Sequence, residues 1–378
     1  MTELMNQHLS SLRGLLSQTS IKLVVALVAI FFFFVVAIGV QEAVNAHRSN
    51  KRILAELEAA GVPPDERQQD RRMTSPWWDG YDASLRFLGP RNREMITRHT
   101  TIVGMAALGM TMVIILGGID LSVGSIVALS SVVIAWLLQY AGAKPLTAAL
   151  GGVAAAALFG LISGLLITWL RVVPFIVTLG MMLVVRGAAK GIAREQKIDV
   201  DIARQKWLPE LLRTVVGTEH SWIRVPAGVW VWLILAVVMW AMLRYTRLGR
   251  HTFAIGSNEQ TARLCGVAVE RVKVIVYTLC GAFAGLAGLM QFSYLRAGDP
   301  TGAVGLELNV IAAVVIGGGS LGGGEGSILG TLMGALIMTV IATGCAQMWL
   351  PNWVQEIITG AIIVVAVGLD RLRHRRSI

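Results

Sequence analysis

Charged residues are scarce in this chain. Only 15% of its 378 residues are Asp, Glu, Lys or Arg, whereas 55% are hydrophobic and the mean hydropathy is +0.65. A typical soluble domain carries about 25% charged residues. The deficit excludes a chain that lies mostly in water. The formal net charge of +10 would suggest nucleic acid in a soluble protein, but here it indicates basic loops kept on the cytoplasmic side of a membrane. We expect no nucleic-acid partner.

Motifs for energy conversion and catalysis are missing as well. No segment reads G-x-x-x-x-G-K-[ST], and the glycine-rich run 317–326 lacks the lysine of such a phosphate-binding loop. There is no nucleophile elbow, dinucleotide fingerprint or pair of zinc ligands. The cysteines, at 265, 280 and 345, have no paired spacing, and the histidines stand alone. We therefore expect a non-catalytic chain that binds no cofactor and no metal.

Long apolar runs dominate what is present. In lipid, backbone groups must pair within their own segment, so these runs predict helices. We expect an all-α polytopic membrane protein with about ten spans: 21–40, 100–117, 121–139, 146–170, 174–192, 226–243, 272–292, 306–319, 327–345 and 353–369. The first run follows basic residues and resembles a signal peptide, but it is long enough to cross a bilayer, so we interpret it as a retained span.

Charge asymmetry predicts the orientation. Ten spans with a cytoplasmic N-terminus place the basic loop 244–271 and the basic tail 371–378 in the cytoplasm, as the positive-inside rule requires. The predicted organisation is then a cytoplasmic N-terminus with the first span (1–40), a periplasmic insertion (41–99) and a core (100–370). Within the insertion, 47–73 reads as a solvated helix that breaks at Pro63–Pro64. Trp77, Trp78 and Tyr81 follow where an interfacial aromatic belt would lie.

Glycine recurs in two informative patterns. The pairs Gly160/Gly164, Gly187/Gly191, Gly281/Gly285 and Gly330/Gly334 have the four-residue spacing that lets helices approach closely. The sequence VIILGGIDLSVGSI from 113 also resembles VVIGGGSLGGGEGSI from 314, each being an apolar run, a glycine-rich break and a second apolar run. Paired interrupted segments point to the pathway of a transporter, although glycine composition alone could produce the match. Whether each break is a half-helix or a full loop is left open.

Asp120 is the most informative polar residue in the apolar region. An acid inside the membrane is costly, but glycines at 117 and 118 allow the chain to turn here. Asp120 or Ser122 would then cap the next helix, and direct contact of Asp120 with substrate or a proton is the alternative. Further candidates for the pathway or for helix ends are Glu307, Asn309 and Glu325.

The loop 244–271 contains a second helix signature. Asn258 is a good N-cap, Glu259 favours a first turn and Gly266 is a good stop, which predicts a short surface helix at 258–265. Flanking spans would hold this helix close to the membrane. It would suit docking to a moving partner, or it would simply anchor the loop.

Four segments in a fixed order carry a resemblance to a known family. They are Gly118-Ile-Asp-Leu-Ser-Val-Gly124, Val173-Pro-Phe-Ile-Val-Thr-Leu-Gly180, Thr246-Arg-Leu-Gly-Arg250 with Ala254-Ile-Gly-Ser-Asn258, and Ile311-Ala-Ala-Val-Val-Ile-Gly-Gly-Gly319 followed by Gly323-Gly-Glu-Gly-Ser327. Over about 100–370 the chain resembles the membrane permease subunits of bacterial ATP-binding-cassette importers for ribose, galactose, xylose and related monosaccharides. Within the family pattern, Asn309 stands where Asp is usual, and 41–90 is longer than in most members.

The resemblance implies a ten-helix core similar to that of the cobalamin-type (type II) importers, in the bacterial inner membrane with both termini cytoplasmic. It implies a second permease copy, identical or related, a periplasmic sugar-binding protein and a cytoplasmic ATPase that binds the ATP and Mg²⁺. Asn258, Glu259, Ala262 and Gly266 would belong to the coupling helix that meets this ATPase. Alternatives are a permease for branched-chain amino acids or another small polar solute, an ion-coupled secondary transporter and, least favoured, a membrane enzyme.

Overall fold

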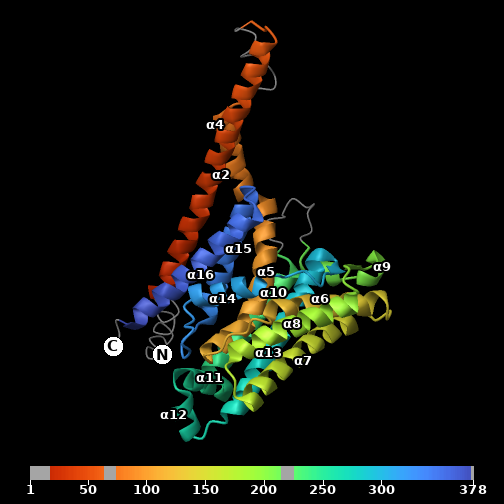
Figure 1. The fold of residues 1–378 in the computed structure, drawn as a ribbon, viewed down its shortest axis with the longest axis vertical. Coiled ribbons are helices and arrows are strands. Elements are labelled where there is room, and N and C mark those ends of the chain that lie inside the picture. Colours follow the sequence, from red (N-terminus) through yellow and green to blue (C-terminus); the bar gives the residue numbers. More distant parts are fainter. Residues whose placement is uncertain (1–17, 64–73, 214–224, 376–378) are drawn as a thin grey trace, which may run out of the picture.

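The computed structural model describes residues 18–63, 74–213 and 225–375 (Figure 1). Its helices are α2 (Gln18–Ala59), α4 (Pro76–Leu88), α5 (Pro90–Ile115), α6 (Val123–Gln139), α7 (Pro145–Leu170), α8 (Pro174–Ala193), α9 (Ile202–Gln205), η1 (Leu208–Leu211), α10 (Ala227–Tyr245), α11 (Arg247–Ser257), α12 (Glu259–Leu264), α13 (Val269–Leu295), α14 (Leu306–Ile316), α15 (Ile328–Gln347) and α16 (Asn352–Arg375). Within this part of the chain only two short strands occur, β1 (Ile198–Asp199) and β2 (Ala297–Gly298), which pair antiparallel.

The fold is that of an all-α polytopic membrane protein. In the described residues seven helices are long and apolar enough to cross a membrane, and α6, α14 and the apolar part of α16 are shorter. Every predicted span has a counterpart among these helices. However, the 11 residues of α14 extend only about 16 Å, roughly half of a bilayer core of about 30 Å. The predicted span 306–319 is therefore a half-helix followed by a loop.

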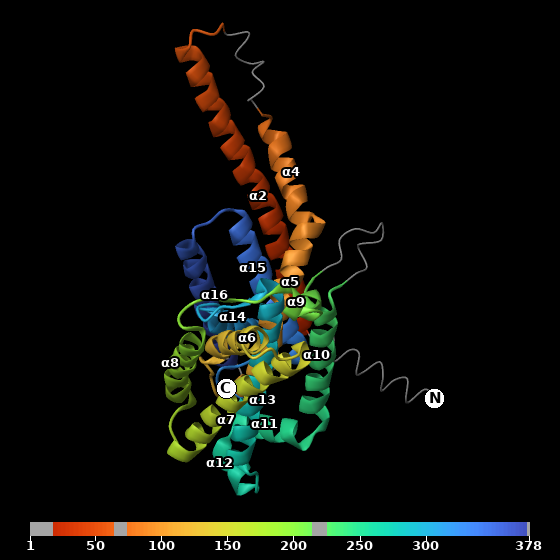
Figure 2. The same cartoon turned by 90° about the vertical axis from the view of Figure 1, so that its right-hand side faces the viewer.

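The N-terminal region differs from the prediction. The expected span 21–40 continues without a break to Ala59, so α2 has 42 residues and is about 63 Å long, twice the hydrocarbon thickness. Residues 47–59 are helical, as expected for the segment 47–73, but they continue the first span because no residue between 40 and 59 ends the helix. The expected Pro63–Pro64 break adjoins residues outside the described part. With α4, α2 forms a hairpin that projects from the bundle at the end opposite α12 (Figures 1 and 2).

An aromatic cluster fixes the base of this hairpin. Phe87 at the end of α4 is fully buried, with its ring centroid 5.2 Å from Phe31 and 6.3 Å from Phe34 of α2. Ser84 Oγ also donates a hydrogen bond to the Val35 carbonyl at 2.9 Å. The phenylalanine run that could have belonged to a signal peptide thus packs against the next helix. Gly89 then ends α4, and α5 begins at Pro90, ten residues before the expected span.

The bundle is built around α13, which packs against α5, α6 and α7. A side chain at Gly281 would come within 2.6 Å of the Ala156 carbonyl oxygen and 2.9 Å of Gly160 Cα, so α7 and α13 cross in backbone contact. Gly334 lies similarly against Ala313 of α14. Three of the four glycine pairs therefore serve close packing, as predicted. The exception is Gly187/Gly191, where nothing lies within 4 Å of an added Cβ.

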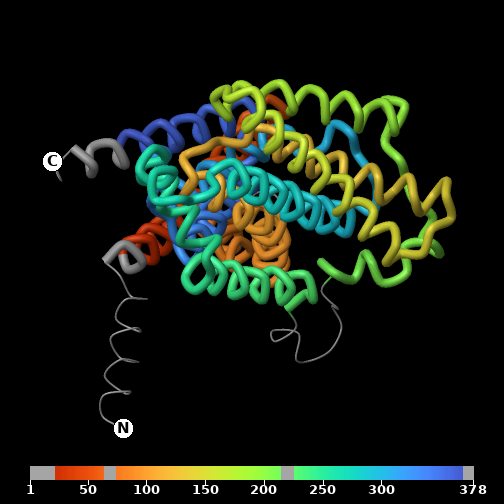
Figure 3. Tube along the Cα trace, turned by 90° about the horizontal axis from the view of Figure 1, so that it is seen from below, coloured from red at the N-terminus to blue at the C-terminus, as the bar shows by residue number. Residues whose placement is uncertain are grey.

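Helices α8 and α10 flank the bundle on opposite sides (Figures 2 and 3). The polar segment between them contains β1, which pairs with β2 after α13. No strand was expected here. Ile198 is buried in this ladder while Asp199 is exposed. Of the cysteines, Cys280 and Cys345 are buried and Cys265 is exposed.

Candidate functional site at the two broken helices and the loop 244–271

The two glycine-rich breaks end their helices with the same backbone geometry. After α5, the Gly117 N–H donates to the Ile114 carbonyl and the Gly118 N–H to the Val113 carbonyl, both at 2.9 Å. After α14, Gly318 donates to Val315 and Gly319 to Val314, again at 2.9 Å. The turning residues have positive φ, +82° at Gly117 and +93° at Gly318. This is the Schellman pattern, in which glycine adopts the left-handed conformation at low cost. The match that the sequence suggested between 113 and 314 is therefore also structural.

Asp120 lies beyond the first break and is fully buried. Its Oδ1 accepts hydrogen bonds from the Ser122 backbone N–H at 2.9 Å and from Ser122 Oγ at 2.6 Å. Ser122 holds the N-cap position of α6 without a side-chain capping bond of its own. The two predicted caps thus act together: Ser122 occupies the position and Asp120 satisfies its backbone amide. Among the described residues Asp120 Oδ2 has no hydrogen-bond partner.

Tyr277 of α13 packs against the same break, and no local sequence pattern singled it out. It is fully buried, and a Cβ at Gly118 would overlap its hydroxyl oxygen. Within the described residues that hydroxyl has no hydrogen-bond partner. A tyrosine in the middle of an apolar helix carries no local signal that predicts which loop it will contact. Two polar groups, Asp120 Oδ2 and Tyr277 Oη, are therefore buried at the break with unused bonding capacity.

The other three predicted pathway residues lie on or beside α14. Only Glu307 approaches the same helix end as Asp120. Glu307 is in the first turn of α14, where Oε1 accepts from the Gly305 N–H at 3.3 Å. Its other oxygen lies so close to α6 that a Cβ at Gly124 would overlap it. Asp120 and Glu307 thus both approach the first turn of α6. Asn309 is half-buried further along α14, and Glu325 is exposed in the second break.

The loop 244–271 contains two helices where one was expected. The predicted helix at 258–265 is confirmed as α12, with Asn258 Oδ1 accepting from the Thr261 N–H at 2.8 Å. Gly266 follows with φ +82°. The additional helix α11 begins at the N-cap Thr246, whose side chain accepts from the Gly249 N–H at 3.2 Å. The Thr-Arg-Leu-Gly sequence contains this capping residue and could have revealed α11.

Ion pairs tie α12 to the start of α13. Lys273 Nζ lies 2.8 Å from Glu259 Oε2, and Arg263 lies 2.5 Å from Glu270 Oε1 and 3.4 Å from Glu259 Oε1. The hydrogen bond to Glu270 raises the pKa of the Arg263 guanidinium, which stays charged. Lys273 is one helical turn from Tyr277, so residues on successive turns of α13 face α12 and the first break. Helix α13 thereby connects the two features.

The outward face of α12 is not the one expected. Ala262, expected to belong to the helix that meets a partner, is only 4% exposed and packs within this chain. Its side chain therefore faces the bundle, and the predicted contact of this helix with a partner stays a prediction. Leu264 is instead 89% exposed at the end of the helix. The helical period explains the difference, since Ala262 faces the bundle and Leu264 is two residues further round the helix.

Glycines from three segments meet where α11 reaches the breaks. We call Gly117, Gly256, Gly323 and Gly324 the glycine junction. The Gly324 N–H donates to the Ile115 carbonyl at 2.8 Å, which joins the second break to the end of α5. A Cβ at Gly256 of α11 would overlap this carbonyl oxygen and lie 2.6 Å from Gly324 N, and a Cβ at Gly323 would lie 2.6 Å from Gly256 O and 2.9 Å from Gly117 Cα. The loop 244–271 is thus in backbone contact with both glycine-rich breaks.

Comparison with known proteins identifies the family. Residues 92–367 match the model of the family described as branched-chain amino acid transport system / permease component. The chain belongs to this permease family. It is 36% identical over 297 residues to the ribose import permease protein of Escherichia coli strain K12, covering 77% of this chain and 89% of that protein. No solved structure matches the chain.

Other relatives have names that specify other sugars. The L-arabinose ABC transporter permease protein of Azospirillum brasilense is 38% identical, with 77% of this chain and 83% of that protein covered. The fructose import permease protein of Rhizobium meliloti is 35% identical, with coverages of 76% and 79%. Helices α2 and α4 lie before residue 92 and hence outside the family match.

Proposed function

We propose that this chain is the membrane-spanning subunit of an ATP-driven importer that moves a monosaccharide from the periplasm to the cytoplasm by alternating access. Family membership supports a permease subunit. The names of the relatives, which specify ribose, L-arabinose and fructose, favour a sugar over the branched-chain amino acids of the family description. The chain would work in the inner membrane with both termini in the cytoplasm, as one of two permease copies with ten-helix, type II cores.

The glycine junction is the observation that best supports a mechanism in which movement of α12 reaches both breaks. A force applied to α12 passes through α11 to Gly256, and backbone contact transmits it to both breaks without flexible side chains in between. A second route runs through the Lys273–Glu259 ion pair to α13 and on to Tyr277. A cytoplasmic ATPase that binds ATP and Mg²⁺ would supply the force at α12, where Asn258, Glu259 and Leu264 form the contact and Gly266 ends the helix.

The residues at the first break would serve the pathway. Asp120 holds the start of α6 through Ser122, and Glu307 approaches the same turn from α14. Movement of α11 would shift α6 and α14 relative to each other, which changes the access to these polar groups. A periplasmic sugar-binding protein would deliver the substrate at the opposite face. Asn309 and Glu325 lie on the second broken segment and would move with it.

Reconstitution tests this proposal. The permease is placed in liposomes with its partner ATPase and sugar-binding protein, and uptake of labelled ribose, arabinose, fructose and leucine is measured. We expect uptake of one of the sugars that stops when ATP hydrolysis is blocked by vanadate. Uptake that survives vanadate but collapses with the proton gradient would overturn the proposal, and selective uptake of leucine would favour the amino-acid alternative.

A matched pair of leucine variants tests whether the exposed end of α12 contacts the ATPase. Leu264→Ala removes the exposed side chain on α12, whereas Leu146→Ala removes another exposed leucine, 59% accessible, at the start of α7. We expect Leu264→Ala to lower co-purification of the ATPase and uptake together. Leu146→Ala should leave both unchanged. Equal behaviour of the two variants would show that α12 is not the ATPase contact.

A further inference from the structure

The hairpin of α2 and α4 forms a groove that the proposed function does not use. Its volume is about 710 Å³, and it is bounded by one face of each helix. The helices cross at its floor with little side chain between them, since a Cβ on Gly80 would lie 3.3 Å from the Gly39 carbonyl carbon. The family match begins at residue 92, so this groove belongs to a part of the chain outside the family core.

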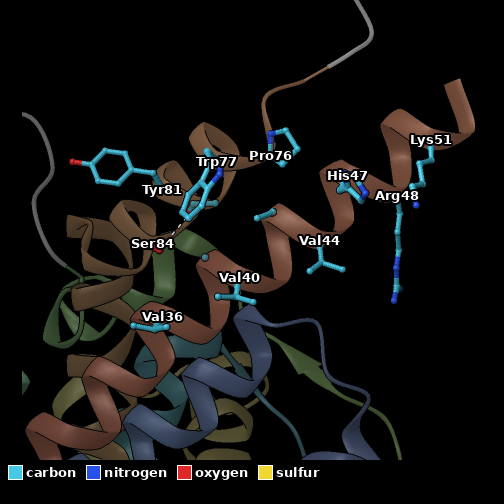
Figure 4. Close-up of a pocket in the computed structure, with 13 residues that line it drawn as sticks. Val36, Val40, Val44, His47, Arg48, Lys51, Pro76, Trp77, Tyr81 and Ser84 are labelled. Carbon is cyan, nitrogen blue, oxygen red and sulfur yellow. Dashed lines mark hydrogen bonds between the residues drawn. The ribbon is translucent and has the colours of Figure 1, made fainter. Parts of the chain in front are cut away.

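The lining of the groove changes character along α2. Val36, Val40 and Val44 come first, one helical turn apart, and are substantially exposed. His47, Arg48 and Lys51 follow toward the end of the hairpin. Figure 4 shows this order, with the valines nearer the bundle and the basic side chains beyond them. Over roughly four turns the surface thus passes from apolar to cationic.

Aromatic side chains from α4 border the middle of the groove. The Trp77 ring lies beside it and is 87% exposed, and Tyr81 is 56% exposed one turn further along (Figure 4). Tryptophan and tyrosine favour the level of lipid headgroups, because their rings are apolar and their N–H or O–H groups are polar. This places the change from valine to basic residues at the membrane surface, beyond the apolar first half of α2.

The basic residues have no partner within the described part of the chain. Neither Arg48 nor Lys51 makes a hydrogen bond or an ion pair there, and no carboxylate is among the described residues that line the groove. Two unpaired cations at one end of an apolar groove match a ligand with an anionic head and an apolar tail. A soluble protein partner would not need the valine end, which continues into the apolar half of α2.

From this arrangement we propose that the groove between α2 and α4 binds an anionic phospholipid. One acyl chain lies along Val36, Val40 and Val44, and the phosphate lies between Arg48 and Lys51. Trp77 packs over the glycerol region. Under the proposed topology the lipid belongs to the periplasmic leaflet, and it would hold the projecting hairpin at a fixed depth in the membrane.

Native mass spectrometry in detergent tests this site. The full-length permease is titrated with phosphatidylglycerol, phosphatidylethanolamine or phosphatidylcholine of the same chain length, and the bound lipid is counted. We expect the phosphatidylglycerol to bind most tightly. Because each basic residue near a membrane surface contributes about 1 kcal/mol of attraction, the double change Arg48→Gln and Lys51→Gln should weaken its binding about thirty-fold. Arg52→Gln, on the same helix but outside the groove, should change it little.

A second pair of variants tests the apolar part without altering charge. Val40→Trp fills the groove, while Val28→Trp places the same side chain at an equally exposed position on α2, 62% against 58%, outside the groove. Only Val40→Trp should abolish the tight phosphatidylglycerol site. The proposal fails if both tryptophan variants retain lipid like the wild type, or if the groove variants change the number of permease copies in the particle instead, which would mark a contact between copies.

Discussion

Replacing Gly256 by alanine tests the glycine junction most directly. In a helix, Gly→Ala is normally stabilising by about 1 kcal/mol. Here the added Cβ would overlap the Ile115 carbonyl oxygen and come within 2.6 Å of Gly324 N. Both neighbours are backbone atoms, so no side-chain rotation can relieve the overlap, and α11 must move.

The size of the effect follows from what α11 displaces. Overpacking of a tightly packed contact costs about 1–3 kcal/mol. Parting the 2.8 Å bond from Gly324 N to Ile115 O leaves a buried donor and acceptor, which costs a further 1–3 kcal/mol or so. After the helix-propensity gain of about 1 kcal/mol, we expect Gly256→Ala to lower the free energy of unfolding by about 1–5 kcal/mol.

The assay combines unfolding in mixed detergent micelles with ATP-driven uptake in liposomes. Gly187→Ala on α8 is the control, because nothing lies within 4 Å of its added Cβ. We expect Gly256→Ala to lose at least ten-fold in uptake while the ATPase still co-purifies, since α12 itself is untouched. If Gly256→Ala unfolds and transports like the control, backbone contact at the junction does not couple α11 to the breaks.

Three further predictions concern the neighbouring contacts. Lys273→Met removes the partly buried ion pair to Glu259, so stability should change by about 1 kcal/mol or less while uptake falls several-fold; equal uptake by the variant and the wild type would exclude this route. Gly281→Val would push α7 and α13 apart and should lower the unfolding free energy by about 1–3 kcal/mol in micelles, whereas Gly360→Val, with open space around it, should not. Asp120→Asn keeps an acceptor for Ser122, so it should retain uptake that Asp120→Ala loses; failure of both in a liposome assay would assign the negative charge itself a role.

The positions of most helices could be predicted from the local sequence, because backbone groups in lipid must form their hydrogen bonds within one segment. Apolar runs predicted the helices, and Asn258 and Gly266 predicted both ends of α12. The similarity of the segments that begin at 113 and 314 could be seen in the sequence, because a Schellman turn favours glycine at one fixed position. Helix ends without such a signal were missed, as α2 shows by continuing to Ala59.

The candidate site could be predicted from the sequence only in part. Asp120 and Ser122 stood out because a carboxylate is rare among apolar residues. Tyr277, Lys273 and Gly256 did not, because their roles depend on which segment each one meets across the fold. That Ala262 faces the bundle could not be predicted either, because a helix of six residues has too few positions to show which face is buried.

By itself the sequence determined that this chain lies in a membrane, where its helices run, where two of them break and that no nucleotide loop is present. These are local properties, set by hydropathy, capping and the conformational range of glycine. Only the tertiary structure decided that both breaks meet at Gly256 and that α2 and α4 enclose a groove. Such contacts join residues up to about two hundred positions apart, and their selection depends on how whole helices pack rather than on any local pattern.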